Sequence, residues 1–317
     1  MPELPEVETM RRDLEREVVG RRIERARVWR REGLSDGRPI DVAPRVRRIW
    51  QARTEQNTLE DGLALHLEEH TISSVRRRGK YLLLDLDSAE ALMIHLGMTG
   101  HLWLSGRDDE PEKHHYLTLA LDDGRELRLS DPRGFGEARA LTRDEVEALW
   151  RRLGPEPLSP EFSAEYLAAQ LARRKALIKP LLLNQTIVAG LGNIYVDEAL
   201  WGARVHPLRR ANTLAPAEGH AVHDAIVEVI GASIERRGTT FSDFRDLAGA
   251  PGRNRDYLQV FHRDDAPCPR CETPIQMMRV GGRGTSFCPT CQRLELDEHY
   301  NRGLTPTPAL PHQGGRG

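Results

Sequence analysis

The segment YLLLDLDSAEALMIHLGMTGHLWLSG (81–106) carries the clearest structural pattern of this chain. Short apolar runs alternate in it with polar breaks, and the pattern continues in YLTLAL (116–121) and RELRLS (125–130). Asp122-Asp123-Gly124 is one of these breaks. Short apolar runs that are bounded by turn residues are typical of antiparallel strands. The central part of the chain therefore predicts an antiparallel sheet or a β-sandwich.

Helices are predicted on both sides of these strands. Near the start, Val7, Met10, Leu14 and Val18 recur at helical spacing, with Pro5 in the first turn and Gly20 at the end. After the strands, the pair Thr142 and Glu145 has the spacing of a capping box, which predicts a helix through Leu153. The segment 28–70 is irregular and rich in arginine, and it predicts no particular element.

The second half of the chain begins with a stiff polar connector, GPEPLSP (154–160), which we take as a domain boundary. Beyond it the pattern predicts helices over 161–173, 176–184, 193–202 and 215–236, and then a small β-ribbon. The last residues, LTPTPALPHQGGRG (304–317), have a composition typical of a disordered tail. The predicted domains are 1–155, 156–256 and 257–293, followed by a tail over 294–317.

Composition excludes some classes of protein. The chain has 317 residues, about two domains' worth, with 39% apolar residues, 30% charged residues and a net charge of −2. It has no apolar run of the roughly 18–20 residues that a transmembrane helix needs, and its acidic N-terminus does not resemble a secretory signal. We therefore expect a cytoplasmic protein without a membrane partner. Only four of the 46 basic residues are lysines, a bias that GC-rich coding also produces.

All four cysteines lie in two C-x₂-C pairs, Cys268 with Cys271 and Cys288 with Cys291. Two such pairs separated by 16 residues fall in the zinc-ribbon range and can supply four thiolates to one structural Zn²⁺. Two disulfides or four free thiols are the alternatives, and a reducing compartment disfavours the disulfides. A bound zinc would hold the intervening hairpin, so that Arg283 projects from a rigid turn.

The N-terminus carries a candidate nucleophile. Removal of Met1, which a small second residue normally permits, would leave Pro2 with a free secondary amine. An N-terminal amine has a pKa of about 8, so more of it is unprotonated at neutral pH than of a lysine. Attack on an aldehydic carbon would give a cationic iminium, and Glu3 is placed to serve as a general acid. The alternative is that proline and acidic residues simply start a helix.

Taken together, these motifs resemble those of the formamidopyrimidine-DNA glycosylases, bacterial repair enzymes that excise oxidised purines. The resemblance runs from residue 1 to about 293 and is weak only in 28–70. It rests on these stretches: MPELPEVET (1–9), RRRGKYLLLDL (76–86), IHLGMTG (94–100), SDPRGFGE (130–137), LGPEPLSPEF (153–162), NQTIVAGLGNIYVDEALW (184–201), RGTTFSDF (237–244) and the cysteine ribbon.

The resemblance implies an α+β, multidomain architecture. It consists of an N-terminal β-sandwich with an N-terminal helix, a helix–two-turn–helix domain and a Cys₄ zinc ribbon. The implied activity is a bifunctional DNA glycosylase and abasic-site lyase of base excision repair, and the implied partner is damaged double-stranded DNA. We expect a monomer that associates with the bacterial nucleoid when it is bound to DNA.

Site residues are also implied by the resemblance. Pro2 would form a Schiff base with C1′ of the damaged nucleotide, Glu3 would protonate the opening sugar, and Lys80 would assist β-elimination. Arg283 is implied in δ-elimination and phosphate binding. The implied DNA contacts comprise three side chains that fill the space of the flipped nucleotide and four further positions: Met98, Arg133 and Phe135, and then His95, His114, Arg174 and Asn193. The other three lysines, at 113, 175 and 179, fall in stretches that resemble the family's DNA-contact regions.

Two departures and two alternatives accompany the resemblance. The usual Arg-Arg-Phe of the family is Arg133-Gly134-Phe135 here, and the segment 28–70 is longer than expected. One alternative is an endonuclease VIII-like glycosylase, which acts on oxidised pyrimidines. The other is a non-catalytic protein that binds damaged DNA. Retention of Met1 would favour the latter, because a blocked proline cannot form an iminium.

Overall fold

The structure is a computed structural model that describes residues 2–28, 63, 66–110 and 114–294. Most of the segment 28–70 and almost all of the predicted tail lie outside these residues. The chain divides into two compact units. The first comprises residues 1–162, 184–192 and 227–257, and the second comprises 163–183, 193–226 and the chain from Leu258 onward. The predicted domain boundaries remain predictions.

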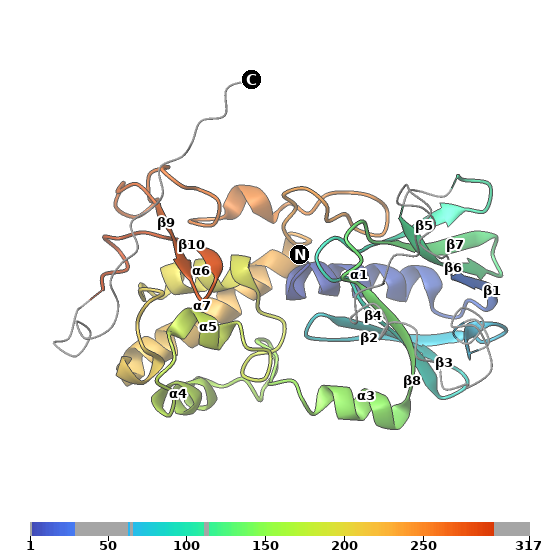
Figure 1. Cartoon of the computed structure of the whole chain (residues 1–317), viewed down its shortest axis with the longest axis horizontal. Coiled ribbons are helices and arrows are strands. Elements are labelled where there is room, and N and C mark those ends of the chain that lie inside the picture. The colour runs from blue at the N-terminus through green and yellow to red at the C-terminus, as the bar shows by residue number, and fades with distance from the viewer. Residues whose placement is uncertain (1, 29–62, 64–65, 111–113, 295–317) are drawn as a thin grey trace, which may run out of the picture. The chain divides into compact units, whose positions relative to one another are not determined.

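The first unit contains two four-stranded antiparallel sheets (Figure 1). One sheet has the order β1-β6-β7-β5, and its strands are β1 (Ile23–Val28), β5 (His101–Gly106), β6 (His115–Leu121) and β7 (Arg125–Ser130). The other has the order β2-β3-β4-β8, and its strands are β2 (Ile72–Arg78), β3 (Tyr81–Leu86), β4 (Glu90–His95) and β8 (Glu137–Thr142). These sheets confirm the predicted sandwich.

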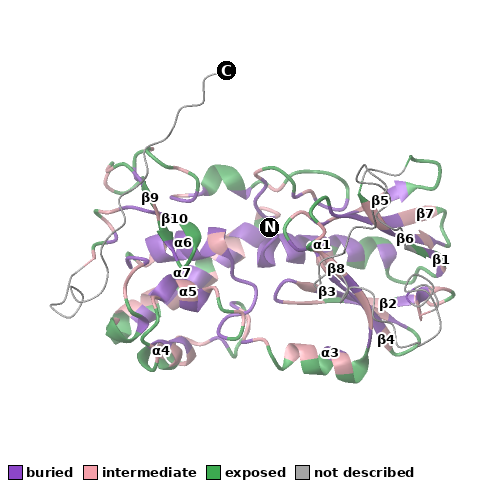
Figure 2. Ribbon diagram, viewed as in Figure 1, coloured by how far each residue is buried: buried purple, intermediate pink, exposed green. Residues whose placement is uncertain are grey.

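Helix α1 (Leu4–Val18) shares one apolar core with both sheets of the first unit. Met10, Leu14 and Val18 are fully buried, as their helical spacing requires. They belong to the same cluster as Leu84 of β3 and Leu119 of β6. Figure 2 shows how the burial of α1 changes along its length, with its first turns almost wholly buried. The helix that carries the N-terminus is therefore fixed by the core of the unit.

Helix α3 (Arg143–Trp150) covers the other face of the β2-β3-β4-β8 sheet. Val146 packs there with Leu83, Met93 and Leu141. The predicted capping box is present, because Glu145 N donates to Thr142 Oγ1 and Thr142 N donates to Glu145 Oε2 at 3.0 Å. The helix ends at Trp150, before the expected Leu153, and the chain continues through turns.

The second unit combines helices with a β-hairpin. Its elements are α4 (Ala164–Ala172), α5 (Ile178–Leu182), α6 (Asn193–Gly202), the first part of α7 (Pro216–Glu235), β9 (Gln276–Val280) and β10 (Arg283–Phe287). Strands β9 and β10 pair antiparallel across Gly281 and Gly282. The predicted helices and ribbon are thus confirmed, although α5 is shorter than the predicted 176–184.

Three strands of the first unit were not predicted: β1, β2 and β8. β2, with the sequence ISSVRRR, buries only Ile72 and Val75 and has no run of apolar residues. Its place in the sheet comes from pairing with β3, in the register Arg78 with Tyr81.

Among the described residues, no helix is both long and apolar enough to cross a membrane.

Candidate functional site

The N-terminal end of α1 is buried and held by hydrogen bonds from two loops of the first unit. Pro2 and Glu3 are buried, with Glu3 only 2% exposed. Glu3 N donates to Glu6 Oε2 at 2.7 Å, and Glu6 Oε1 accepts from Thr239 N at 2.7 Å. Leu4 N donates to Gly190 O at 3.1 Å. The two residues of the proposed chemistry therefore occupy a fixed position.

The loop that contains Gly190 and Gly192 lies directly against this end of the helix. A Cβ atom at Gly192 would lie 2.3 Å from Cδ of Glu3, and one at Gly190 would lie 2.5 Å from Cδ1 of Leu4. Only glycine permits so close an approach. The glycines of AGLGN thus give the Glu3 carboxyl its space, a reason that the sequence alone does not reveal.

Lys80 lies in the two-residue turn between β2 and β3 and is only 8% exposed. A Cβ atom at the preceding Gly79 would lie 3.4 Å from Gly190 N, so this turn packs on the loop that also contacts Leu4. The structure therefore brings the turn of Lys80 and the N-terminus to the same loop. His95 faces Tyr81 across the β3–β4 pairing, next to Lys80.

His95 is neutral at physiological pH. Its burial, together with the charge of Lys80, lowers the pKa of His95 from 6.5 to about 4. Gly97 N donates to His95 Nδ1 at 3.3 Å, so the ring proton lies on Nε2. His95 can therefore donate a hydrogen bond, but it carries no positive charge.

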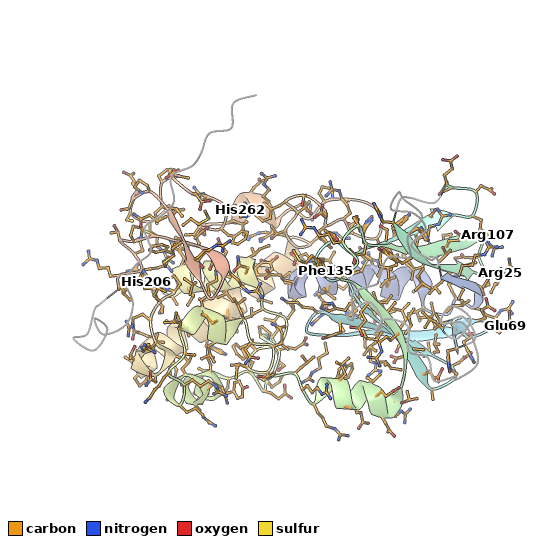
Figure 3. The ribbon with its side chains drawn as sticks, in the orientation of Figure 1. Arg25, Glu69, Arg107, Phe135, His206 and His262 are labelled. Atoms are coloured by element: carbon orange, nitrogen blue, oxygen red, sulfur yellow. The ribbon has the colours of Figure 1, made fainter. Side chains whose placement is uncertain are left out.

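Two loops of the first unit expose apolar side chains next to each other. Met98 is 40% exposed and Phe135 is 52% exposed, unusual values for large apolar residues. Phe135 lies in the loop between β7 and β8 (Figure 3). A Cβ atom at Gly97 would lie 2.5 Å from the backbone of Phe135, which shows that the two loops touch. Arg133 is exposed on the same loop as Phe135.

Asp131 joins these two loops, and sequence reasoning did not single it out. Its carboxylate accepts hydrogen bonds from Thr99 Oγ1, from Arg133 N at 3.2 Å and from Gly136 N. The side chain is 3% exposed. The motif SDPRGFGE contains a signal for this role. An Asp side chain commonly accepts a hydrogen bond from the backbone amide two residues further along and so stabilises a turn.

The remaining predicted site residues have different surroundings. His114 is exposed and has φ of +64° at the start of β6. In the second unit, Arg174 is partly buried, and its Nη1 donates to Gln170 O at 2.9 Å and to Gln170 Oε1 at 2.6 Å. Gly134 has φ of +66°, a conformation that glycine adopts without strain.

Asn193 and Arg283 are brought together within the second unit. Asn193 is the first residue of α6, and its Nδ2 donates to Gly284 O at 2.9 Å. Arg283 immediately precedes Gly284 and is exposed at the start of β10, directly after the hairpin turn. Arg283 is thus exposed next to the turn of the hairpin, and its role stays a prediction. The amide of Asn193 ties this hairpin to the helix.

Lys179 is buried, although it lies in one of the stretches that resemble the family's DNA-contact regions. It is 0% exposed, and its Nζ donates to Asp197 Oδ1 at 2.6 Å, Thr285 Oγ1 at 2.8 Å and Gly284 O at 2.9 Å. Asp197 Oδ2 accepts from Ser286 N at 3.0 Å. This ion pair fastens β10 to α5 and α6. Lys113 lies outside the described residues.

The four cysteines of the second unit form one cluster. Their sulfur atoms all lie within 4.8 Å of one another, with pairs such as Cys268 and Cys291 at 3.9 Å and Cys271 and Cys291 at 3.5 Å. Tetrahedral zinc with Zn–S bonds of about 2.3 Å separates its sulfurs by about 3.8 Å. The donor set therefore fits one structural Zn²⁺. Trp201 Nε1 donates to Cys268 Sγ at 3.4 Å and anchors the cluster to α6.

The fold and these sites define a multidomain protein with a buried Pro2 and Glu3 at the start of its first helix, a β-sandwich and a Cys₄ zinc ribbon. Family models match the N-terminal domain of formamidopyrimidine-DNA glycosylase over residues 1–138 and its H2TH domain over 153–245. A third, the zinc finger found in FPG and IleRS, matches 266–294. The chain belongs to the formamidopyrimidine-DNA glycosylase family.

Individual relatives agree with this assignment. The formamidopyrimidine-DNA glycosylase of Herpetosiphon aurantiacus is 44% identical over 92% of this chain and 100% of its own length. That of Symbiobacterium thermophilum is 43% identical over 100% of this chain and 95% of its own. Lactococcus lactis Fpg, solved with DNA that contains an abasic site, is 35% identical with a TM-score of 0.81 and covers 92% of this chain and 100% of that one.

Proposed function

We propose that this chain is a bifunctional DNA glycosylase and abasic-site lyase of base excision repair that excises oxidised purines. The observation that carries the proposal is the buried Pro2-Glu3 end of α1, held against the glycine loop that also contacts the turn of Lys80. A complex of a Lactococcus lactis Fpg mutant with Fapy-dG-containing DNA has a TM-score of 0.80 to this chain at 36% identity and covers 92% of this chain and 100% of that one.

In the first step, the amine of Pro2 attacks C1′ of the damaged nucleotide, and the N-glycosidic bond breaks. Glu3 supplies a proton to the ring oxygen as the sugar opens, and the proton that the amine loses passes to the departing base. The product is an iminium between Pro2 and C1′. Because the iminium carries a positive charge at any pH, it draws electrons from the adjacent C2′–H bond.

In the second step, the strand is cleaved by elimination. A base removes a proton from C2′, and the electron pair of that C–H bond forms the C1′=C2′ double bond of an enamine. The enamine electrons then form a C2′=C3′ double bond, the C3′–O bond breaks so that the 3′ phosphate leaves, and the iminium is restored. Lys80 is suited to this proton exchange because an amine can lose a proton and a guanidinium cannot. δ-Elimination of the 5′ phosphate follows, with Arg283 stabilising the phosphate that departs.

DNA would be bound by side chains of each unit, some of them exposed and others partly buried. Flipping a base out of a duplex leaves a hole, and Met98 and Phe135 are apolar side chains of the right kind to fill it. Arg133 offers several donors to the base that loses its partner. The phosphates would be contacted by five further side chains, of which His95 is neutral: His95, His114, Arg174, Asn193 and Arg283. One zinc ion held by the four cysteines supplies rigidity to the ribbon and takes no part in the chemistry.

The test is trapping with borohydride on a duplex that contains 8-oxoguanine. Full-length protein loaded with zinc and shown by intact mass to lack Met1 should give a covalent protein–DNA adduct and a nicked strand. Failure to trap an adduct would contradict the proposal and favour a non-catalytic binder. Faster excision of thymine glycol than of 8-oxoguanine would instead favour the endonuclease VIII-like alternative.

A further inference from the structure

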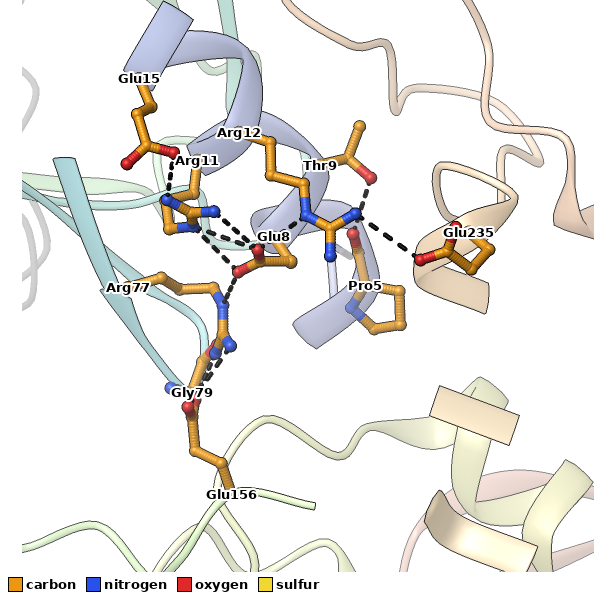
Figure 4. A network of polar contacts seen from close by, with 10 residues as sticks. All are labelled: Pro5, Glu8, Thr9, Arg11, Arg12, Glu15, Arg77, Gly79, Glu156 and Glu235. Carbon is orange, nitrogen blue, oxygen red and sulfur yellow. Dashed lines mark hydrogen bonds and ion pairs between the residues drawn. The ribbon is translucent and has the colours of Figure 1, made fainter. Parts of the chain in front are cut away.

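A partly buried network of charged side chains in the first unit connects helix α1 to the turn that carries Lys80 (Figure 4). Its centre is Arg77, the penultimate residue of β2, whose side chain is 10% exposed. The sequence alone does not distinguish Arg77 from its neighbours Arg76 and Arg78. The network explains why this arginine is largely shielded from solvent.

At one end, Arg77 binds the helix that begins with Pro2. Its Nε donates to Glu8 Oε2 at 2.9 Å. Glu8 also accepts from Arg11 Nη2 and from Arg12 Nε, both at 3.0 Å. Although burial alone raises the pKa of Glu8, hydrogen bonds from Arg11 and Arg77 hold it below 4.5, so the carboxylate is ionised.

At the other end, Arg77 binds both the turn and the connector of the first unit. Its Nη1 donates to Gly79 O at 3.1 Å and to the carboxylate of Glu156, and its Nη2 donates to Glu156 Oε2 at 3.3 Å. Gly79 N donates to Glu156 Oε1 at 2.6 Å. Both backbone polar groups of Gly79 are therefore fixed, one by each partner of the ion pair.

Fixing Gly79 also fixes Lys80, the next residue in the chain. Gly79 and Lys80 are the only two residues of the hairpin loop, since Arg78 pairs with Tyr81. Gly79 has φ of +58°, which matches the two-residue loops that have glycine at the first central position. In so short a loop, the direction of the Lys80 side chain follows from the backbone of Gly79.

We infer that Arg77 is a positioning residue that sets Lys80 relative to the Pro2 end of α1. The guanidinium suits this role because its rigid fork can donate in three directions at once, to Glu8, Gly79 O and Glu156. The inference rests on the proposed function, because it assigns to Arg77 the placement of the amine that assists elimination.

The chain offers a matched control in Arg11. Arg11 also donates to Glu8, but its other ion pair is with the exposed Glu15 of the same helix rather than with Glu156. Replacing either arginine by methionine removes one partner of Glu8. Only the change at Arg77 also releases the turn of Lys80, so the difference between the two variants reports the positioning effect.

The experiment compares Arg77→Met, Arg77→Lys and Arg11→Met with the wild type in full-length, zinc-loaded protein that lacks Met1. Single-turnover reactions on a duplex with a natural abasic site measure two rates. One is the formation of the borohydride-trappable adduct, and the other is cleavage of the strand. Affinity is measured on a duplex with tetrahydrofuran, an abasic analogue that cannot react. Circular dichroism and thermal unfolding check the fold of each variant.

A misplacement of about 1 Å can cost up to 100-fold in rate, so we expect Arg77→Met to slow strand cleavage at least tenfold. Adduct formation should fall much less, and affinity should stay within twofold of the wild type. Arg77→Lys, which keeps the charge without the fork, should be intermediate, and Arg11→Met should match the wild type within twofold. If Arg77→Met does not fold, Arg77→Lys provides the same comparison.

Two results would overturn the inference. One is cleavage by Arg77→Met, or by Arg77→Lys if the former does not fold, that is no slower than cleavage by Arg11→Met. The other is a loss spread equally over adduct formation, cleavage and affinity, which indicates general damage. Absence of any adduct with the wild type is a separate outcome, because it contradicts the proposed function itself.

Discussion

At the level of single residues, two buried lysines differ in their surroundings, although both lie in stretches that resemble motifs of the family. Lys80 and Lys179 are both almost fully buried, at 8% and 0% exposure. Lys179 is enclosed by Asp197, Thr285 and Gly284 and fastens β10 to two helices. Lys80 lies instead in a turn beside His95, in the unit that contains Pro2. Of these two lysines, only Lys80 is placed for the proposed proton exchange.

Replacing Lys80 by arginine tests this role. The variant keeps a positive charge, so we expect it to bind a tetrahydrofuran duplex with an affinity within about threefold of the wild type. Strand cleavage should slow by about 100-fold or more, because general acid–base catalysis contributes roughly 10²–10⁴ and a guanidinium does not exchange protons at neutral pH. Gel-shift and single-turnover assays measure the two quantities. Cleavage at the wild-type rate would remove Lys80 from the mechanism.

His95 makes the stability of the protein depend on pH. Its pKa is about 4 in the folded protein and 6.5 when it is unperturbed, with burial as the main cause. The unfolded chain therefore binds the proton more readily, so the contribution of neutral His95 is present above pH 6.5 and is lost as pH falls towards 4. A difference of this size corresponds to about 3 kcal/mol.

The measurement is urea unfolding of the wild type and of His95→Gln at pH 7.5 and pH 5. The wild type should lose more stability than the variant on going to pH 5. His115 and His206 also have pKa values lowered to about 4, mainly by burial, so the variant should retain some pH dependence. Equal losses in the two proteins would show that His95 does not titrate as described.

At the level of elements, the two loops that expose Met98 and Phe135 are joined by Asp131. Replacing Asp131 by alanine removes the acceptor of Thr99 Oγ1, Arg133 N and Gly136 N. We expect a loss of about 1–3 kcal/mol in stability and a larger loss of lesion affinity than of affinity for undamaged DNA. Asp122→Ala, in the exposed β6–β7 turn, is the control and should change neither. Equal affinity losses for the two DNAs would contradict the proposed link to the flipped base.

The zinc ribbon is the second element with a definite prediction. Cys268→Ser should abolish stoichiometric zinc binding, because a structural site depends on all four thiolates. Collapse of β9 and β10 would remove Arg283 from its place and abolish specific DNA binding. The strands of the first unit should persist in circular dichroism, since their apolar core is built without residues of the ribbon. Unimpaired DNA binding by this variant would show that the ribbon is dispensable.

For the molecule as a whole, a net charge of −2 conceals strong local charge. The arginines of α1 are paired with carboxylates, as are Arg76 and Arg77 of β2, whereas Arg133 and Arg283 are exposed. Exposed basic side chains of this kind attract phosphates even when the total charge is near zero. Overall charge is therefore a poor guide to the partner of this chain.

Salt dependence measures these contacts directly. The logarithm of the affinity for a lesion duplex should fall linearly with the logarithm of salt concentration, with a slope of about −0.9 per phosphate contacted. Arg283→Ala should make the slope less steep by about one contact. Arg107→Ala is a control, because Arg107 pairs with Glu24 and with Leu121 O. An unchanged slope for Arg283→Ala would show that this arginine does not neutralise a phosphate.

Local sequence patterns were enough to predict most of the elements and the metal site. The period of Val7, Met10, Leu14 and Val18 predicted α1, the apolar runs predicted the central strands, and the two C-x₂-C pairs predicted the cluster. These features are local, because the residues that carry each pattern are also the residues that form the predicted helix, strand or metal site. β2 was missed because its partner β3, rather than its own composition, makes it a strand.

The burial and the partners of the charged residues, in contrast, became known only from the folded chain. Arg77 reaches Glu156 across 79 positions of sequence, and Lys179 reaches Thr285 across 106. A guanidinium or ammonium group is stable in the interior only with such partners, and no pattern within one segment records them. The sequence thus indicated the residues that do the proposed chemistry. The fold revealed the partners of Arg77, which we infer to position Lys80, and those of Asp131, which joins the loops of Met98 and Phe135.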